Sequence, residues 1–214
     1  MANEPIATTC AGRTDAGVHA IAQVVHFDTS AERSERGWIR GANSNLPDDI
    51  NARWAKPVDQ EFDARFSATS RSYQYLILNR MVRSALSRNR AWWVSQPLDA
   101  ENMQQAADHL LGEHDFSAFR AAGCQASTPL RKIGELNVSR NEDWISVDVT
   151  ANAFLQHMVR NIAGLLVAIG KGDEEPAWAR QVLDSRDRTK GGMAAPAHGL
   201  TLTRVDYPER DDLP

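Results

Sequence analysis

The segment 154–169 constrains the fold most strongly, because its apolar residues recur at intervals of three and four. This spacing places apolar side chains along one stripe of an α-helix. A second set of residues falls on a different face and is spaced to lie together, namely His157, Arg160, Asn161 and Gly164. The segment therefore predicts a long helix that packs one stripe and presents polar groups elsewhere.

Strand patterns surround this helix. In 144–151 the apolar residues Ile145, Val147 and Val149 alternate with polar ones, which is typical of a half-buried strand, and 132–140 completes a hairpin with it. Other predicted strands cover 18–28, 50–58, 71–79, 92–95 and 199–205, and other predicted helices cover 34–45, 99–111 and 177–183. Because hairpin pairs are present and β-α-β units do not dominate, we expect an α+β fold with a mostly antiparallel sheet.

Bulk composition limits the class of protein. The chain has 214 residues, of which 42% are hydrophobic and 24% charged, so disorder throughout is excluded and one large or two smaller domains are expected. Cys10 and Cys124 are the only cysteines and form no C-x-x-C motif, which favours a reducing compartment. The start of the chain has no signal-peptide pattern and no segment is apolar enough to span a bilayer. We expect a cytoplasmic protein with no membrane partner.

Charge is unevenly distributed. The net charge is −4, which argues mildly against nucleic-acid binding. However, the stretch 64–98 contains no Asp or Glu, and its arginines are Arg65, Arg71, Arg80, Arg83, Arg88 and Arg90. Local field matters more than net charge for a polyanionic partner. Charge alone leaves two interpretations open, an RNA-binding surface and a chance grouping of surface arginines.

A short loop carries the first candidate for chemistry. Gly12 and Gly17 bracket Arg13-Thr-Asp15-Ala before a predicted strand. Glycines permit a tight excursion that can present an Asp side chain at the end of a sheet. Such a carboxylate can be a nucleophile, a base or a metal ligand, and Arg13 would favour its ionised form. An ordinary Asp-Ala-Gly turn explains the loop equally simply.

Other catalytic patterns are missing from the sequence. It has no Gly-x-Ser-x-Gly elbow, no dinucleotide fingerprint and no phosphate-binding Gly-x-x-x-x-Gly-Lys loop. The six histidines include no His-x-x-x-His pair, so a metal site is not expected.

Aromatic residues alternate with arginines in two places, Phe62-Asp-Ala-Arg65-Phe66 and Arg71-Ser-Tyr73-Gln-Tyr75. Proteins that bind RNA stack bases on aromatic rings and hold phosphates with arginine. Phe66 and Tyr75 could equally be core residues of a strand, so the residues alone leave the RNA hypothesis open.

Taken in order, the motifs resemble the TruA family of tRNA pseudouridine synthases over nearly the whole chain. The matching segments are Gly12-Arg-Thr-Asp-Ala-Gly-Val-His-Ala20, Gln23-Val-Val-His-Phe27, Phe62-Asp-Ala-Arg-Phe-Ser-Ala68, Arg71-Ser-Tyr-Gln-Tyr75, Gly112-Glu-His-Asp-Phe-Ser-Ala-Phe-Arg120, Asn152-Ala-Phe-Leu-Gln-His-Met-Val-Arg-Asn-Ile162 and Gly199-Leu200. One segment alone would be moderate support, whereas all of them in this order are specific.

The resemblance implies a fold and an activity. The implied fold has two similar α+β halves joined in one extended, mostly antiparallel sheet with helices on one face. The implied enzyme is a homodimer that isomerises uridine to pseudouridine in the anticodon stem-loop of tRNA, at positions 38, 39 and 40, without cofactor or metal.

The resemblance also assigns roles to residues. Asp15 resembles the catalytic nucleophile, and Tyr73 the residue that stacks on the uracil ring. Arg160 resembles the arginine that pairs with the catalytic carboxylate, although a purely structural ion pair is the simpler alternative for it. Leu200 resembles an apolar wall of the uridine pocket, so Tyr73, Arg160, Leu200 and Arg13 are the expected substrate-binding residues. The expected RNA-binding residues are Arg65, Phe66, Arg71 and Arg120.

The chain departs from the family pattern at its start. Only nine residues precede Cys10, so we expect the family's N-terminal strand and helix to be missing and the N-terminal half to be incomplete. On this basis 1–61 is the partial N-terminal half that carries the catalytic loop, and 62–214 is the C-terminal half. The departure supports an alternative hypothesis, a truncated tRNA-binding protein without catalytic activity.

Overall fold

The structure, a computed structural model, describes residues 2, 5–211 and 213–214. Its backbone forms two compact units. The first comprises Met1–Arg13, Val24–Thr69 and Asp206–Pro214, within these described limits, and the second comprises Thr14–Gln23 and Ser70–Val205.

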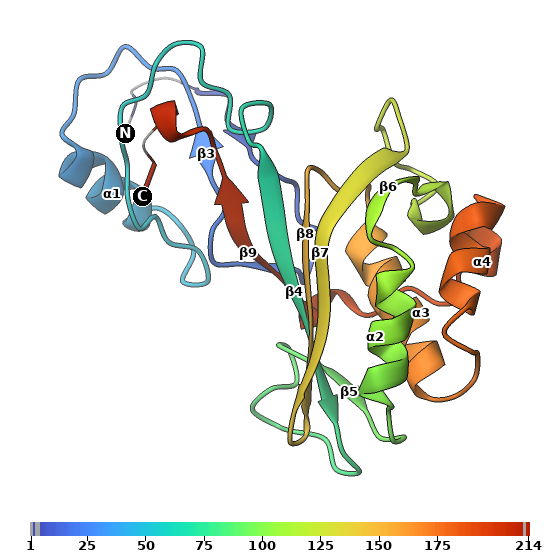
Figure 1. Ribbon diagram of the computed structural model, residues 1–214. Helices are drawn as coiled ribbons and strands as arrows, with labels where there is room; N and C mark the ends of the chain where they lie inside the picture. Colours follow the sequence, from blue (N-terminus) through green and yellow to red (C-terminus); the bar gives the residue numbers. More distant parts are fainter. Residues whose placement is uncertain (1, 3–4, 212) are drawn as a thin grey trace. The chain divides into compact units, whose positions relative to one another are not determined.

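A mixed sheet forms the centre of the second unit (Figure 1). Its strands follow the order β2 (His19–Ala20), β9 (Leu200–Asp206), β4 (Ser70–Asn79), β8 (Trp144–Ala151), β7 (Leu130–Asn141) and β6 (Gly112–Asp115), and β5 (Trp92–Val94) pairs with β4. The pairs β4–β8, β8–β7 and β7–β6 are antiparallel, whereas β2–β9 and β4–β5 are parallel. The predicted α+β fold with a mostly antiparallel sheet is therefore confirmed.

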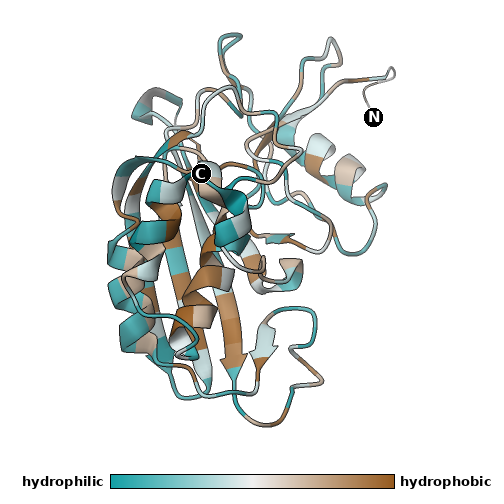
Figure 2. Cartoon of the chain, turned by 90° about the vertical axis from the view of Figure 1, so that its right-hand side faces the viewer, coloured by the Kyte–Doolittle hydropathy of each residue, from teal (hydrophilic) through white to brown (hydrophobic). Residues whose placement is uncertain are grey.

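Three helices lie on one side of this sheet in Figure 1: α2 (Ala100–Asp108), α3 (Met158–Gly170) and α4 (Trp178–Ser185). Asp99 caps α2 by accepting hydrogen bonds from the backbone N–H groups of Glu101 and Asn102. The alternating strands turn their apolar faces toward α2 and α3, and hydrophobic residues form bands on strands and helices in Figure 2. Burial of this shared apolar surface stabilises the unit.

Helix α3 begins four residues later than the periodicity predicted and is buried on more than its apolar stripe. His157 has a φ of 64°, a left-handed conformation that cannot belong to an α-helix, so the regular helix begins at Met158. Asn161 and Gly164, which were expected on a separate polar face, are buried as well. Among the helices that the structure describes, none has both the length and the apolar character needed to cross a bilayer.

Several predicted elements differ from the observed ones. The single strand expected over 18–28 is two short strands, β2 and β3 (Val25–His26), because the chain bends after Ala20. Residues 50–58 form no strand, although their composition favoured one. Strand β6 was not predicted; it begins at Gly112, whose φ of 97° turns the chain from the residues after α2 into the sheet.

The first unit is smaller and has a thinner core. Strands β1 (Thr9–Cys10) and β3 pair antiparallel, and α1 (Glu35–Asn43) begins at the cap residue Ser34 but has no fully buried residue. Phe62 packs on the Tyr207 ring at 5.2 Å between centroids, and the Tyr207 hydroxyl donates to the Ala64 carbonyl at 2.7 Å. These contacts tie the segment after Asp206 to the segment that precedes β4.

Candidate active site around Asp15

Asp15 lies in a tight turn that leads directly into the sheet. The Asp15 carbonyl accepts a hydrogen bond from the Val18 N–H at 3.0 Å, and Gly17 has a φ of 84°, which favours glycine at this position. The strand β2 follows at once and pairs with β9, with His19 opposite Thr201. The turn is therefore fixed to the edge of the sheet, and it leaves the Asp15 side chain 28% exposed.

The N-terminal part of α3 holds the Asp15 carboxylate. Arg160 Nη1 donates to Asp15 Oδ2 at 3.0 Å, and Arg160 Nε donates to the Ala195 carbonyl at 2.8 Å. The arginine side chain is only 17% exposed, so both of its contacts are largely shielded from water. A charge-assisted hydrogen bond of this kind fixes the orientation of the carboxylate.

His157 makes a second contact with the same carboxylate oxygen. Its Nε2 lies 3.2 Å from Asp15 Oδ2, and its side chain is 34% exposed. The left-handed backbone of His157 directs the imidazole to this position immediately before α3 begins. Among the described residues, none donates a hydrogen bond to Oδ1 of Asp15, so the two oxygens are inequivalent: Oδ2 is held and Oδ1 is available for chemistry.

The segment 193–199 supports Arg160 from the other side. The Ala195 N–H donates to the Arg160 carbonyl at 2.9 Å, which complements the bond from Arg160 Nε to the Ala195 carbonyl. The buried Tyr75 hydroxyl donates to the Pro196 carbonyl at 2.7 Å. Burial raises the pKa of Tyr75, with the Arg160 charge opposing the rise, so Tyr75 remains a neutral hydrogen-bond donor at physiological pH.

Leu200 and Tyr73 belong to β9 and β4, the first and second strands from β2 in the sheet. Tyr73 on β4 is 9% exposed and packs edge-to-face on Phe154 at 5.1 Å between ring centroids. Leu200 begins β9 and is 6% exposed. In the order β2–β9–β4, the strand that carries Leu200 pairs with the strand that follows Asp15, and the strand that carries Tyr73 is the next one in the sheet.

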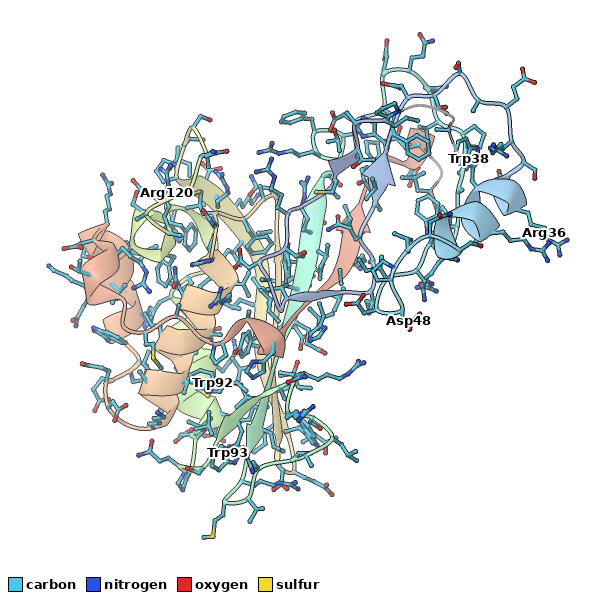
Figure 3. The ribbon with its side chains drawn as sticks, turned by 180° about the vertical axis from the view of Figure 1, so that it is seen from behind. Arg36, Trp38, Asp48, Trp92, Trp93 and Arg120 are labelled. Atoms are coloured by element: carbon cyan, nitrogen blue, oxygen red, sulfur yellow. The ribbon has the colours of Figure 1, made fainter. Side chains whose placement is uncertain are left out.

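The remaining predicted residues have varied surroundings. In the first unit, Arg13 is exposed, Phe66 is 79% exposed, and the Arg65 guanidinium lies 5.2 Å from the Phe66 ring centre. In the second unit, Arg71 is only 8% exposed and its Nη1 donates to the Asn152 carbonyl at 3.1 Å. Arg120 is half-buried, and its Nη2 donates to the carbonyls of Cys124 and Ala126 (Figure 3 labels Arg120). Arg71 and Arg120 therefore support backbone segments.

Sequence reasoning missed part of this arrangement. It grouped His157 with Arg160 by helical spacing but gave it no role, and it assigned nothing to Ala195 or Pro196. The backbone contacts of 193–199 leave no pattern in side-chain chemistry, so no sequence signal could have found them. Among the described residues, no cluster of three or more His, Cys, Asp or Glu is arranged to hold a metal ion.

Comparison with known proteins identifies the chain's relatives. A family model described as tRNA pseudouridine synthase matches residues 2–67 and 106–208. The chain is 55% identical over 214 residues to "tRNA pseudouridine synthase A" of Nitrosococcus oceani, covering 100% of this chain and 83% of that protein. It is 53% identical to the protein of the same name from Coxiella burnetii, covering 100% and 82%. For Methylococcus capsulatus the identity is 52% over 209 residues, covering 98% and 77%.

These similarities and the α+β fold define the protein as an enzyme of the isomerase class. Within that class, the chain belongs to the tRNA pseudouridine synthase family.

Proposed function

We propose that this protein converts uridine to pseudouridine in tRNA and that Asp15 is the nucleophile. The observation that carries the proposal is the asymmetric carboxylate. Arg160 and His157 both contact Oδ2, and Oδ1 receives no hydrogen bond from the described residues. In a chain whose relatives are named tRNA pseudouridine synthase A, this is the arrangement that an attacking carboxylate needs.

The reaction requires no external redox partner. The glycosidic N1–C1′ bond breaks, a C5–C1′ bond forms, the proton on C5 leaves and N1 gains a proton, so uridine and pseudouridine have the same atoms. A nucleophile assists by adding to the base at C6 or to the ribose at C1′, and either adduct lets the base detach and rotate. With Oδ2 held, Asp15 attacks through Oδ1 while Arg160 keeps the carboxylate oriented.

Neighbouring residues would receive the uracil ring. The target base must leave its stack to reach a carboxylate on a protein surface. We assign Tyr73 to stacking on that base and Leu200 to an apolar wall, since β9 pairs with β2 and β4 is the next strand of the sheet. Arg13 is assigned to substrate binding as well, and Arg65 with Phe66 forms an exposed cation–π pair suited to RNA.

The proposal also includes the modified positions, the oligomeric state and the compartment that the family resemblance implies. The substrate site is the anticodon stem-loop, at positions 38, 39 and 40, the enzyme acts as a homodimer, and it resides in the cytoplasm. Sedimentation of the purified chain tests the homodimer.

Position-resolved sequencing tests the substrate site. An unmodified tRNA transcript is incubated with the chain and pseudouridine is mapped, and the same is done with transcripts in which uridines 38, 39 and 40 are replaced by cytidine. We expect pseudouridine at these positions only. Pseudouridine elsewhere in the tRNA would contradict the anticodon assignment, and tRNA binding without any product would support the non-catalytic alternative.

A further inference from the structure

We propose that residues 80–91, here called the β4–β5 loop, form a second RNA-binding surface that contacts the sugar–phosphate backbone next to the target uridine. The proposal rests on the proposed function, because the RNA concerned is the one whose uridine reaches Asp15. Its support is independent of the catalytic site and comes from charge, exposed apolar side chains and the way the loop is anchored.

The loop is positively charged and largely unneutralised. It contains no Asp or Glu and four arginines. Arg80 pairs with Asp143 at 3.4 Å, but Arg83, Arg88 and Arg90 are exposed, and no described carboxylate forms an ion pair with them. Three uncompensated guanidinium groups in so short a segment suit a polyanion, in a chain whose net charge is −4.

Large apolar side chains are exposed in the same loop. Met81 is 84% exposed, Val82 66% and Leu86 94%. Exposing apolar side chains to water is energetically unfavourable, and a group of exposed apolar side chains marks an interaction site. Among arginines, apolar side chains can pack on ribose and on base edges while the guanidinium groups contact phosphates.

Internal hydrogen bonds order the loop. Arg80 Nε donates to the Val82 carbonyl at 2.7 Å. The Ser87 N–H donates to Ser84 Oγ at 3.1 Å, and the Arg90 N–H donates to the Ser87 carbonyl at 2.9 Å. A pre-ordered loop loses less entropy on binding than a flexible one.

Both ends of the loop are anchored in the sheet. Ala91 is 4% exposed, and the Trp92 ring packs on Tyr75 at 6.3 Å between centroids. Trp93, labelled with Trp92 on β5 in Figure 3, donates from Nε1 to the Arg80 carbonyl at 2.9 Å. The loop is thus fixed at the lower end of the sheet in Figure 1.

One contact connects the loop to the strand that follows the catalytic turn. His19 Nε2 lies 2.6 Å from the Asn89 carbonyl oxygen, and His19 is in β2. His19 is four positions after Asp15 in the chain, so their Cα atoms are at most about 14 Å apart even with the chain fully extended. The β4–β5 loop is therefore within reach of an RNA stem-loop whose uridine occupies the Asp15 site.

Charge favours RNA over a second copy of this chain as the occupant. A symmetric contact between two β4–β5 loops would press arginines against arginines with no acidic residue in either loop. Phosphates supply the opposite charge directly, and releasing their counterions favours binding.

Binding measurements on the full chain test the proposal. The variant Arg83→Gln/Arg88→Gln/Arg90→Gln and the wild type are titrated with unmodified tRNA across a series of salt concentrations. We expect tRNA affinity to fall on the order of tenfold near 0.1 M salt, and the slope of log K against log[salt] to become shallower by about two. The matched control is Arg180→Gln/Arg186→Gln/Lys190→Gln, which removes three positive charges on and after α4. It should change affinity less than twofold.

A second variant tests the apolar side chains. Met81→Ser/Leu86→Ser should weaken tRNA binding and leave the sedimenting mass unchanged, and the exposure of both residues means that the fold is retained.

The proposal is overturned if the triple-arginine variant binds tRNA as tightly as the control variant does. It is also overturned if Met81→Ser/Leu86→Ser changes the sedimenting mass but keeps wild-type tRNA affinity, or if the wild-type chain binds no tRNA. A wild type that binds tRNA but makes no pseudouridine would refute the proposed function alone, because the binding comparison still decides the role of the loop.

Discussion

Gly164 offers a direct way to disturb the site without touching a residue that contacts the carboxylate. It lies on α3, one turn after Arg160, where the helix meets the backbone of 193–195. A Cβ added to Gly164 would overlap the Met193 carbonyl oxygen and would lie 3.1 Å from the Met193 carbonyl carbon and 3.2 Å from the Ala195 nitrogen. These atoms are backbone, so relief requires the whole segment to withdraw.

The expected magnitude follows from that geometry. In Gly164→Ala, the segment must move by about 1 Å to restore van der Waals contact, and overpacking of this kind costs roughly 1–3 kcal/mol of unfolding free energy. For a chain of this size the loss corresponds to a fall in Tm of roughly 2–12 °C. The displaced Ala195 carbonyl no longer holds Arg160 Nε in place, and a shift of about 1 Å at a catalytic group can lower kcat on the order of 100-fold.

Two assays separate these effects. Thermal unfolding gives the stability loss, and single-turnover pseudouridine formation at a temperature where the variant is fully folded gives the catalytic loss. Gly134→Ala is the control, because its nearest added-Cβ neighbour, the Thr150 carbonyl oxygen, lies at an ordinary 3.9 Å. If Gly164→Ala is as stable and as active as Gly134→Ala, the inferred coupling between 193–195 and Arg160 is wrong.

Three further predictions concern other contacts. His157→Asn introduces a residue that tolerates the left-handed backbone but removes the imidazole from Asp15 Oδ2. The kcat should fall about tenfold, and KM should stay within about twofold of the wild-type value. The control Glu142→Asn, at a remote left-handed position, should leave both constants unchanged. Asn161→Ala removes the amide that donates to the Phe119 carbonyl at 2.6 Å and accepts from Arg188 Nη2 at 2.9 Å; the unfolding free energy in urea should fall by about 2–4 kcal/mol, and a loss below about 0.5 kcal/mol would contradict the burial argument. Burial alone would raise the pKa of Asp115, but hydrogen bonds from Ser117 and the Arg186 charge outweigh it and lower the pKa below 3.8. A carboxyl whose pKa is lower in the folded state stabilises the protein at pH values above its unfolded pKa, and this contribution is lost as the pH falls through the folded pKa. Asp115→Asn should therefore lower the unfolding free energy by about 1 kcal/mol at pH 7 and leave it unchanged near pH 2. An equal loss at both pH values would contradict this reasoning.

The sequence predicted elements best where one local pattern persisted over several turns or alternations. The hairpin of β7 and β8, the helix α2 with its Asp99 cap and most of α3 were predicted because periodicity and capping are local properties. The interval 18–28 was misjudged because a β-rich composition does not reveal a bend. The start of α3 was misjudged because a left-handed residue other than Gly or Asn leaves no compositional signal.

The site was predictable only in part for a similar reason. Glycine spacing indicated that Asp15 is presented on a turn, and helical spacing separated Arg160 from the apolar stripe. The two side chains that meet are 145 residues apart, so no local pattern could join them, and the family resemblance suggested the pair instead. The support from Ala195 and Tyr75 depends on backbone carbonyls, which are the same in every residue type.

Release of the C5 hydrogen shows whether Asp15 is the nucleophile. Isomerisation must break the C5–H bond of each converted uridine, so tRNA prepared with tritium at uridine C5 releases one tritium for each pseudouridine formed. We expect release by the wild-type chain and none above background by Asp15→Asn, with equal tRNA affinity for both. Tritium release by Asp15→Asn at the wild-type rate would contradict the assignment of Asp15 as the nucleophile.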